Sequence, residues 1–202
     1  MAFPFIIQLQ KTSLLLISPW LLILTKVQYI YQINDKKSFP YRKELQSAIL
    51  NQHDGIELHP TVAQNIQKLA TENTFTITTG HQLCLATGPV YYIYKILTAI
   101  RLAEELKKKY PQNDFVPVFW MATEDHDFEE IAQFNFFNQS YVWQADHFKG
   151  PVGRIKTSEM SDFLATLPAE LDYYKQFYTQ NDTLANATRA LVNDLFGKYG
   201  LL

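Results

Sequence analysis

One stretch of the chain, residues 74–121, constrains the fold more than any other. Thr74–Thr79 is rich in β-branched and aromatic residues, and Phe115–Met121 is a continuous apolar run of strand length. A helical pattern over Pro89–Lys109 separates the two runs. A strand, a helix and a second strand in this order predict a βαβ unit with parallel strands and a right-handed crossover. Pro117 within the second run argues against full pairing of that strand on both sides.

The remaining segments predict further elements around this unit, so the fold class is α/β with a doubly wound parallel sheet and flanking helices. Helical patterns cover Tyr41–Asn51, Pro60–Thr71, Ser158–Leu167 and Thr183–Tyr199, strand-like sequence covers Phe134–Trp143, and Gly150–Ile155 predicts a turn and a short strand. The first half of the Pro89–Lys109 helix is apolar nearly all round, which predicts that it is buried. Another strand would begin at Leu201, so we expect a sheet with an uncovered edge or face.

Composition narrows the class of function. The chain has 202 residues and a formal net charge of -2, so nothing in it calls for a nucleic-acid partner. The dense basic run 107–109 suits the negative end of a helix dipole, with a binding patch as the alternative. Cys84 is the single cysteine, which excludes an intrachain disulfide and a cysteine-rich metal site, and fits a reducing, cytoplasmic setting.

Residues 1–34 differ in composition from residues 35–202, which we expect to form the core domain. The apolar run Leu14–Leu24 is shorter than the roughly 20 residues of a membrane-spanning helix, and Pro19 interrupts it. No small-x-small cleavage site follows it. A buried or atypical segment of a soluble protein is therefore favoured over an uncleaved membrane anchor or a secretory signal.

The loop after the first strand of the βαβ unit is a candidate anion site. Gly80, His81 and Gln82 begin it, and Thr87 and Gly88 precede the next helix, whose free N–H groups would attract phosphate or carboxylate. An ordinary strand–helix turn is the alternative. The loop matches neither the glycine-rich dinucleotide fingerprint nor a P-loop, so a standard NAD or Walker site is not supported. Cys84 of this loop lies among apolar residues and is interpreted as a buried residue rather than a nucleophile.

The loop after the second strand is strongly acidic. Seven residues contain Glu124, Asp125, His126, Asp127, Glu129 and Glu130. Carboxylates beside a histidine can orient it and raise its pKa for general acid–base work, and their oxygens could hold Mg²⁺. An acidic helix start, favoured by the helix dipole, is the alternative. An acidic helix start explains Glu129 and Glu130 well, and it explains the Asp-His-Asp run at 125–127 less well.

Both loops leave the carboxyl ends of strands that we expect to be neighbours, and ligands of open α/β sheets bind at that edge. We therefore expect the two loops to line one site. Lys95 is the only charge in the apolar half of its helix and either reaches water or meets an anion. Arg154, after Gly150-Pro151-Val152-Gly153, is either an anion clamp or a surface ion-pair residue.

Taken together, these motifs resemble the BshC family, the cysteine-adding enzymes of bacillithiol biosynthesis. The residues that carry the resemblance are Thr79-Gly80-His81-Gln82, Thr87-Gly88-Pro89, Tyr94-Lys95, Pro117-Val118-Phe119-Trp120, Glu124-Asp125-His126-Asp127-Phe128-Glu129-Glu130 and Gly150-Pro151-Val152-Gly153-Arg154. Each motif is weak alone, and the ordered set over Tyr41–Leu202 is specific. The resemblance implies a Rossmann-like core and a ligase that joins L-cysteine to glucosaminyl-malate, with ATP or ADP as an open nucleotide requirement.

The resemblance and the loop analysis together define the candidate site residues. Binding of substrate or anion is expected of Thr79, Gly80, His81, Gln82, Thr87, Gly88, Lys95, Glu124 and Arg154, and catalysis of Asp125, His126 and Asp127. Many relatives have glutamine at the position of His81, so that imidazole is given no catalytic role. No metal ligand is assigned, and a site for Mg²⁺ stays open.

Relatives of this family continue well past Leu202 and use a helical coiled-coil region to form homodimers. We therefore expect this chain to be the N-terminal part of a longer enzyme, with small molecules rather than nucleic acid or membrane as partners. Two other functions are kept. One is an inactive remnant or ligand-binding module, and the other is a nucleotidyl-transferring enzyme of similar fold.

Overall fold

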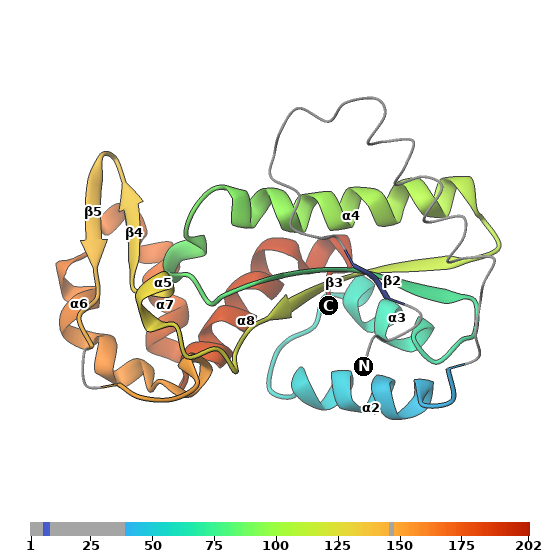
Figure 1. Cartoon of the computed structure of the whole chain (residues 1–202), viewed down its shortest axis with the longest axis horizontal. Helices are drawn as coiled ribbons and strands as arrows, with labels where there is room; N and C mark the ends of the chain where they lie inside the picture. Colours follow the sequence, from blue (N-terminus) through green and yellow to red (C-terminus); the bar gives the residue numbers. More distant parts are fainter. Residues whose placement is uncertain (1–5, 9–38, 146–147) are drawn as a thin grey trace. The chain divides into compact units, whose positions relative to one another are not determined.

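The computed structural model describes residues 6–8, 39–145 and 148–202 (Figure 1). These residues form two compact units, and the boundary between the units falls within two strands and one long helix. The apolar run Leu14–Leu24 lies outside the described residues. Within the described part of the chain, no helix has the length and apolar character needed to cross a membrane.

The central sheet has the strand order β1-β2-β3, with β1 at Ile6–Gln8, β2 at Thr74–His81 and β3 at Asp114–Met121. β1 runs parallel to β2. The N–H of Asp114 donates to the backbone carbonyl of Asn73 at one end of β3, and the N–H of Ala122 donates to the backbone carbonyl of His81 at the other end. The sequence separation between the two bonded residues is the same in both pairs. β3 therefore runs parallel to β2 in a constant register. The predicted β-helix-β unit is confirmed.

Helix α4, at Tyr91–Lys109, links the two strands and covers one face of them (Figure 1). A buried cluster joins helix and strands, and its members are Phe75, Ile77, Ala99, Ala103, Leu106 and Phe115. The alternation of Phe75 and Ile77 places both side chains on the helix side of β2. In the last turn of α4, Lys107 donates to the carbonyls of Pro111 and Asn113, which confirms a role at the helix end.

The expectation that the first half of α4 is buried is wrong for one side of the helix. Tyr92 and Ile96 are buried, and their spacing continues into the buried alanines of the next turns. Val90, Tyr94 and Leu97 are 65%, 52% and 41% exposed. A single helix face is in contact with its neighbours, so an apolar composition all round did not make the helix buried all round.

Helices α2 (Arg42–Gln52) and α3 (Pro60–Lys68) lie beneath the strands in Figure 1, on the face opposite α4. Both helices were predicted, and α3 ends earlier than expected. Nδ1 of His59 accepts the N–H of Thr61 at the start of α3, directly before the proline that occupies the first turn. Arg42 is buried and donates to three carbonyls, those of Leu69, Glu72 and Thr74.

Pro117 lies inside β3 and is tolerated there because its backbone nitrogen faces the edge of the strand that is not paired with β2. Residues 114 and 122 pair with β2, so the residues that alternate with them face the other edge of β3. Proline has no N–H, and on this edge none is required. Its carbonyl accepts the N–H of Leu202 at 3.0 Å, so this edge is in contact with the end of the described chain.

The described part of the second unit includes the first half of α4, a hairpin and several shorter helices. The hairpin strands are β4 (Gln133–Phe136) and β5 (Gln139–Val142), and the helices are α5 (Phe128–Ile131), α6 (Ser161–Thr166), α7 (Asp172–Gln180) and α8 (Leu184–Phe196). Short 3₁₀ turns lie at Leu85–Thr87, Val152–Arg154, Thr157–Met160, Ala169–Leu171 and Gly197–Tyr199. Thr183 caps α8 through its hydroxyl, which accepts the N–H of Asn186. α7 was not predicted.

The short strand expected within Gly150–Ile155 is not formed. Val152–Arg154 is a 3₁₀ turn instead. The reason is the direction of its backbone N–H groups. The N–H of Val152 donates to the backbone carbonyl of Asp125 at 2.7 Å, and the N–H of Gly153 donates to the backbone carbonyl of Thr123 at 3.0 Å. A loop whose N–H groups bond to another loop in this way has no need of a strand partner.

Replacing Arg42 with methionine tests the anchoring of α2. The guanidinium donates to three carbonyls that would lose a charged donor on substitution. We expect the Arg42→Met variant to lose about 2 kcal/mol of unfolding free energy in urea titration. Lys43→Met changes the exposed neighbour in the same helix and is expected to stay within roughly 0.5 kcal/mol of the parent. Equal losses in the two variants would contradict this role.

Candidate active site

The two polar loops meet at the carboxyl ends of β2 and β3, as the sequence predicts. The N–H of Ala122 donates to the carbonyl of His81 at 3.1 Å. One step further along each loop, Nε2 of Gln82 donates to Oδ2 of Asp125 at 3.3 Å. The glycine-histidine loop and the acidic loop are therefore joined by one backbone bond and one side-chain bond.

Gly80 and Lys95 form the inner wall of the first loop. A Cβ placed on Gly80 would lie 3.3 Å from the Trp120 carbonyl oxygen, so the absence of a side chain allows the two strands to approach closely. Nζ of Lys95 donates to the Gly80 carbonyl and lies 5.7 Å from the centre of the Tyr91 ring. The Lys95 side chain is half-buried, so its ammonium is held at the loop rather than extended along the surface.

His81, Thr79 and Thr87 are all buried. The His81 ring lies 4.9 Å from the ring centre of Tyr91 and 5.3 Å from that of Tyr92. This packing indicates that the imidazole supports the loop. The expected binding residues therefore divide into a buried group and a more accessible group, and the latter includes Gln82 and Gly88.

The backbone of the first loop has an uncommon shape. Ala86, Thr87 and Gly88 have φ of 48°, 68° and 53°, which places three consecutive residues in the left-handed region. Such a conformation costs roughly 1–2 kcal/mol for a residue with a side chain. A Cβ on Gly88 would lie 2.5 Å from Cβ of Cys84, so only glycine fits there. This strained bend leads directly into α4.

Cys84 behaves as a buried apolar residue, as expected. Burial raises the pKa of its thiol to about 11, and the negative charge of Glu130 acts in the same direction. Sγ lies 3.5 Å from Nδ1 of His81. A thiol with a raised pKa carries little thiolate at neutral pH, so this group is a poor nucleophile.

Two carboxylates of the acidic loop are engaged by backbone N–H groups. Oδ1 of Asp125 accepts the N–H groups of His126 and Asp127 at 2.7 and 3.1 Å. These bonds lower the pKa of Asp125, with the bond from Asp127 as the largest cause, and Gln82 contributes to the same shift. Asp127 caps α5, because its Oδ1 accepts the N–H of Glu130. The helix-start interpretation therefore accounts for Asp127, while His126 is exposed on the same turn.

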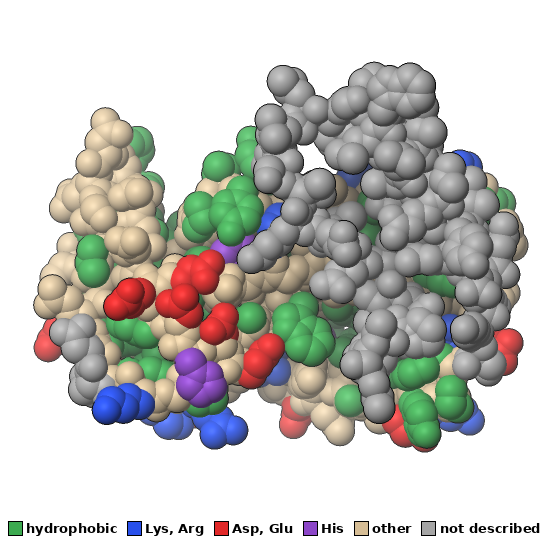
Figure 2. Space-filling view, viewed as in Figure 1, with side chains coloured by type: hydrophobic (Ala, Val, Ile, Leu, Met, Phe, Trp, Pro, Cys, Tyr) green, Lys and Arg blue, Asp and Glu red, His purple; other side chains and the backbone are tan. Residues whose placement is uncertain are grey.

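The acidic side chains gather over α5 on one face of the molecule (Figure 2). Glu124, Asp127, Glu129 and Glu130 are exposed in this loop. Oε1 of Glu124 accepts the indole N–H of Trp120, whose side chain is itself 56% exposed. In the described part of the chain, no group of three histidine, cysteine or acidic side chains is arranged to hold a metal ion.

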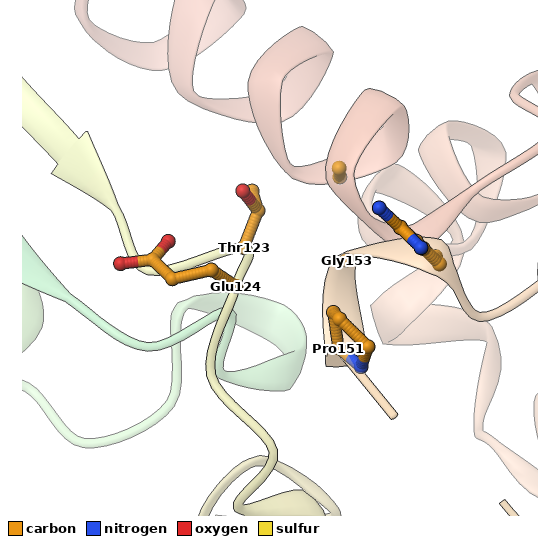
Figure 3. Close-up of a pocket in the computed structure, with 6 residues that line it drawn as sticks. Thr123, Glu124, Pro151 and Gly153 are labelled. Carbon is orange, nitrogen blue, oxygen red and sulfur yellow. The ribbon is translucent and has the colours of Figure 1, made fainter. Parts of the chain in front are cut away.

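A pocket of about 220 Å³ opens where the acidic loop meets the 3₁₀ turn that contains Arg154. Its lining residues are Thr123, Glu124, Pro151, Gly153, Arg154 and Ala185. Figure 3 shows the segment of Thr123 beside that of Gly153, with the Glu124 carboxylate directed away from Pro151. A Cβ on Gly153 would lie 2.6 Å from Cβ of Thr123, so glycine is needed for this close contact. The structure thus brings Glu124 and Arg154 to one pocket.

Three residues of this region were not predicted to have a site role. Trp120 bonds to Glu124, Ala185 lines the pocket from the first turn of α8, and Tyr178 contacts the first loop from α7. The exposed tryptophan at the end of an apolar strand was the one sequence signal that could have found a member of this set. The other two come from segments far along the chain, and no local pattern connects them with the loops.

Comparison with known proteins now identifies the family. The family model described as "Bacillithiol biosynthesis BshC, N-terminal Rossmann-like domain" matches residues 23–202. The chain belongs to this family. The match agrees with the mixed α/β fold and the parallel strands observed here.

Curated relatives of the chain are named "Putative cysteine ligase BshC". The one from Flavobacterium johnsoniae is 47% identical over 171 residues, which cover 80% of this chain and 32% of the relative. The one from Flavobacterium psychrophilum is 46% identical over 186 residues, covering 85% and 35%. The one from Christiangramia forsetii is 41% identical over 182 residues, covering 83% and 34%. This BshC chain therefore spans about a third of the length of these relatives.

Alanine at Gly88 tests the bend of the first loop. Gly88→Ala places a Cβ 2.5 Å from Cys84 and also strains a positive φ, so we expect a loss of at least about 2 kcal/mol in urea unfolding. The matched control is Gly55→Ala, at a φ of +76° with nothing within 4 Å of the added Cβ. Backbone strain alone should cost this control about 1 kcal/mol. Similar losses at both positions would remove the steric argument.

Asparagine at Asp125 tests the acidic turn. The folded-state pKa of this carboxyl is lowered, so its contribution to stability is present above the unfolded pKa and disappears as the pH falls through the folded pKa. Asp125→Asn keeps an oxygen that can accept both N–H groups and removes only the charge, so it should lose less than about 1 kcal/mol at pH 7, and the difference from the parent should shrink below about pH 4. Unfolding midpoints at pH 7 and pH 3 measure this, with Glu129→Gln as an exposed-acid control. A difference that is independent of pH would contradict it.

Proposed function

We propose that this BshC chain is the N-terminal part of a ligase that joins L-cysteine to glucosaminyl-malate in bacillithiol biosynthesis. The observation that carries the proposal is the meeting of three loops, those that contain Gln82, Asp125 and Arg154, at the carboxyl ends of two parallel strands. Ligands of open α/β sheets bind at that edge. Family membership supports the reaction class, and the names of the relatives support a cysteine ligase.

The charges at the pocket suit substrates that carry carboxylates and an amine. Glucosaminyl-malate has two carboxylates on its malate part and one amine on its sugar, and cysteine has one of each. Arg154 supplies a guanidinium at the pocket, and a guanidinium binds carboxylate with two parallel hydrogen bonds. Glu124, which also lines the pocket, supplies a carboxylate that would attract the ammonium of a substrate. We assign the malate carboxylates to the Arg154 side.

The reaction forms a bond between the carboxyl carbon of cysteine and the amine nitrogen of the sugar. In net terms one carboxyl oxygen leaves as water. The ammonium nitrogen loses two of its three protons and keeps one in the amide, so a base is required at the attacking nitrogen. Asp125 is held by two N–H groups and its pKa is lowered, which makes it a weak base. We therefore propose the exposed imidazole of His126 as the proton acceptor, with Asp125 and Asp127 fixing the turn that presents it.

The test uses a chain of the relatives' full length. The present chain is fused to the remaining C-terminal part of the Flavobacterium johnsoniae relative and incubated with L-cysteine and glucosaminyl-malate, with and without ATP. Mass spectrometry should detect the condensed thiol product, and the relative itself serves as the positive control. Adenylate or pyrophosphate formed without cysteine would indicate a nucleotidyl-transferring enzyme. Substrate binding without any product, beside an active control, would indicate a binding module.

Arg154→Gln tests the proposed carboxylate contact in this fusion. Loss of a charge-assisted hydrogen bond should raise the KM for glucosaminyl-malate roughly ten- to a hundredfold. The melting temperature should change little, because the side chain is exposed. Lys156→Gln removes another exposed charge from the same segment and should leave the KM unchanged. Arg154→Lys should recover only part of the binding, because an ammonium lacks the planar fork.

A further inference from the structure

Tyr178 connects a distant helix to the first loop of the candidate site. It lies on α7 (Asp172–Gln180), and its side chain is buried. Its hydroxyl accepts the backbone N–H of Ala86 at 2.9 Å. Ninety-two positions separate the two residues in the chain, so this bond is a tertiary link and not a local turn.

The bond is made at the most strained point of the loop. Ala86 has a φ of 48° and a ψ of 37°, and Thr87 follows with a φ of 68°. Residues with side chains leave this region readily unless their surroundings hold them there. Two hydrogen bonds fix the bend, one from Ala86 to Tyr178 and one from Gly88 to the Leu85 carbonyl. Without the phenol oxygen, a partly buried N–H would lack its acceptor, and the bend would lose one of its two fixed points.

The bend determines where α4 begins. Gly88 is followed by the first turn of α4, where Tyr92 donates to the Pro89 carbonyl. A change of backbone at Ala86 would therefore move Thr87, Gly88 and the N–H groups at the start of the helix together. The loop that contains this bend is bonded to the acidic loop of the candidate site through Gln82 and Asp125, so a shift of the bend would be passed on to that site.

We propose that Tyr178 is a positioning residue for substrate binding, which acts through the left-handed bend at residues 86–88. This inference rests on the proposed function, because it assigns the bend to the substrate site of the ligase. Burial raises the pKa of Tyr178 to about 12, so the phenol stays neutral over the working pH range. Its role is therefore that of a fixed hydrogen-bond partner.

The experiment removes one oxygen atom at a time from α7. Tyr178→Phe deletes the hydroxyl that holds Ala86. Tyr173→Phe is the matched control, because its hydroxyl donates to Oδ2 of Asp194 at 2.5 Å and has no link to the loop. Both variants are prepared in the fusion described above and in the present chain.

We expect Tyr178→Phe to raise the KM for glucosaminyl-malate about fivefold to tenfold, with a kcat within about twofold of the parent. Hydrogen exchange of the peptide that contains residues 84–89 should become faster in this variant. In Tyr173→Phe, both the KM and the exchange of this peptide should match the parent, even where its melting temperature falls by a similar amount. A merely structural tyrosine would lower the melting temperature without changing either readout, and that result would overturn the proposal.

The two readouts separate this proposal from the proposed function. Unchanged exchange at residues 84–89 in Tyr178→Phe would overturn the positioning role whatever the activity. No product from the unsubstituted fusion beside an active control, with the exchange difference present, would overturn the ligase function and would still support the link between Tyr178 and the bend.

Discussion

The parallel pairing of β2 with β3 is the constraint on which the rest of this structure depends. Hydrogen bonds at both ends of β3 keep one register, from Asp114 to Ala122. Parallel strands end on the same edge of a sheet, so the residues that follow them must lie close together. The bond between Gln82 and Asp125 is a direct consequence, because each residue lies just beyond the end of its strand. A shift of register by one residue would separate these two side chains.

The loops at this edge are stabilised largely by one another. Val152 and Gly153 donate to the acidic loop, and the acidic loop uses Asp125 to accept its own N–H groups. Loops have no regular ladder, so their backbone groups need such partners. Close approach is possible because glycine lies at two contact points, beside Trp120 at position 80 and beside Thr123 at position 153. The candidate pocket is therefore a product of loop–loop bonding on a rigid pair of strands.

The sequence predicted those strands and helices that a local pattern of residue types specifies. The β-branched run from Thr74, the apolar run that contains Pro117, and the amphipathic pattern before Phe196 each correspond to an observed element. The convergence of the two loops also followed, because it needs only the order of strand, helix and strand. Exposure along α4 did not follow, since composition alone cannot tell which side of an apolar helix has a neighbour. The hydrogen bond between Tyr178 and Ala86 could not be predicted, because no local sequence pattern connects the strained residues 86 and 87 with a phenol far along the chain.

The acidic loop shows how one cluster of residues divides its chemistry. Carboxylates this close in the chain repel one another unless they are solvated, paired or bound to a cation. Asp125 and Asp127 accept N–H groups of their own turn and so hold the loop in shape. For Asp125 these bonds also lower the pKa, so this carboxylate has weaker basicity to offer a substrate. The exposed side chains of His126 and Glu124, rather than the two aspartates, are the ones through which we propose that this turn acts on a bound molecule. The residue pattern that first suggested catalysis thus combines a structural pair of aspartates with two side chains available for chemistry.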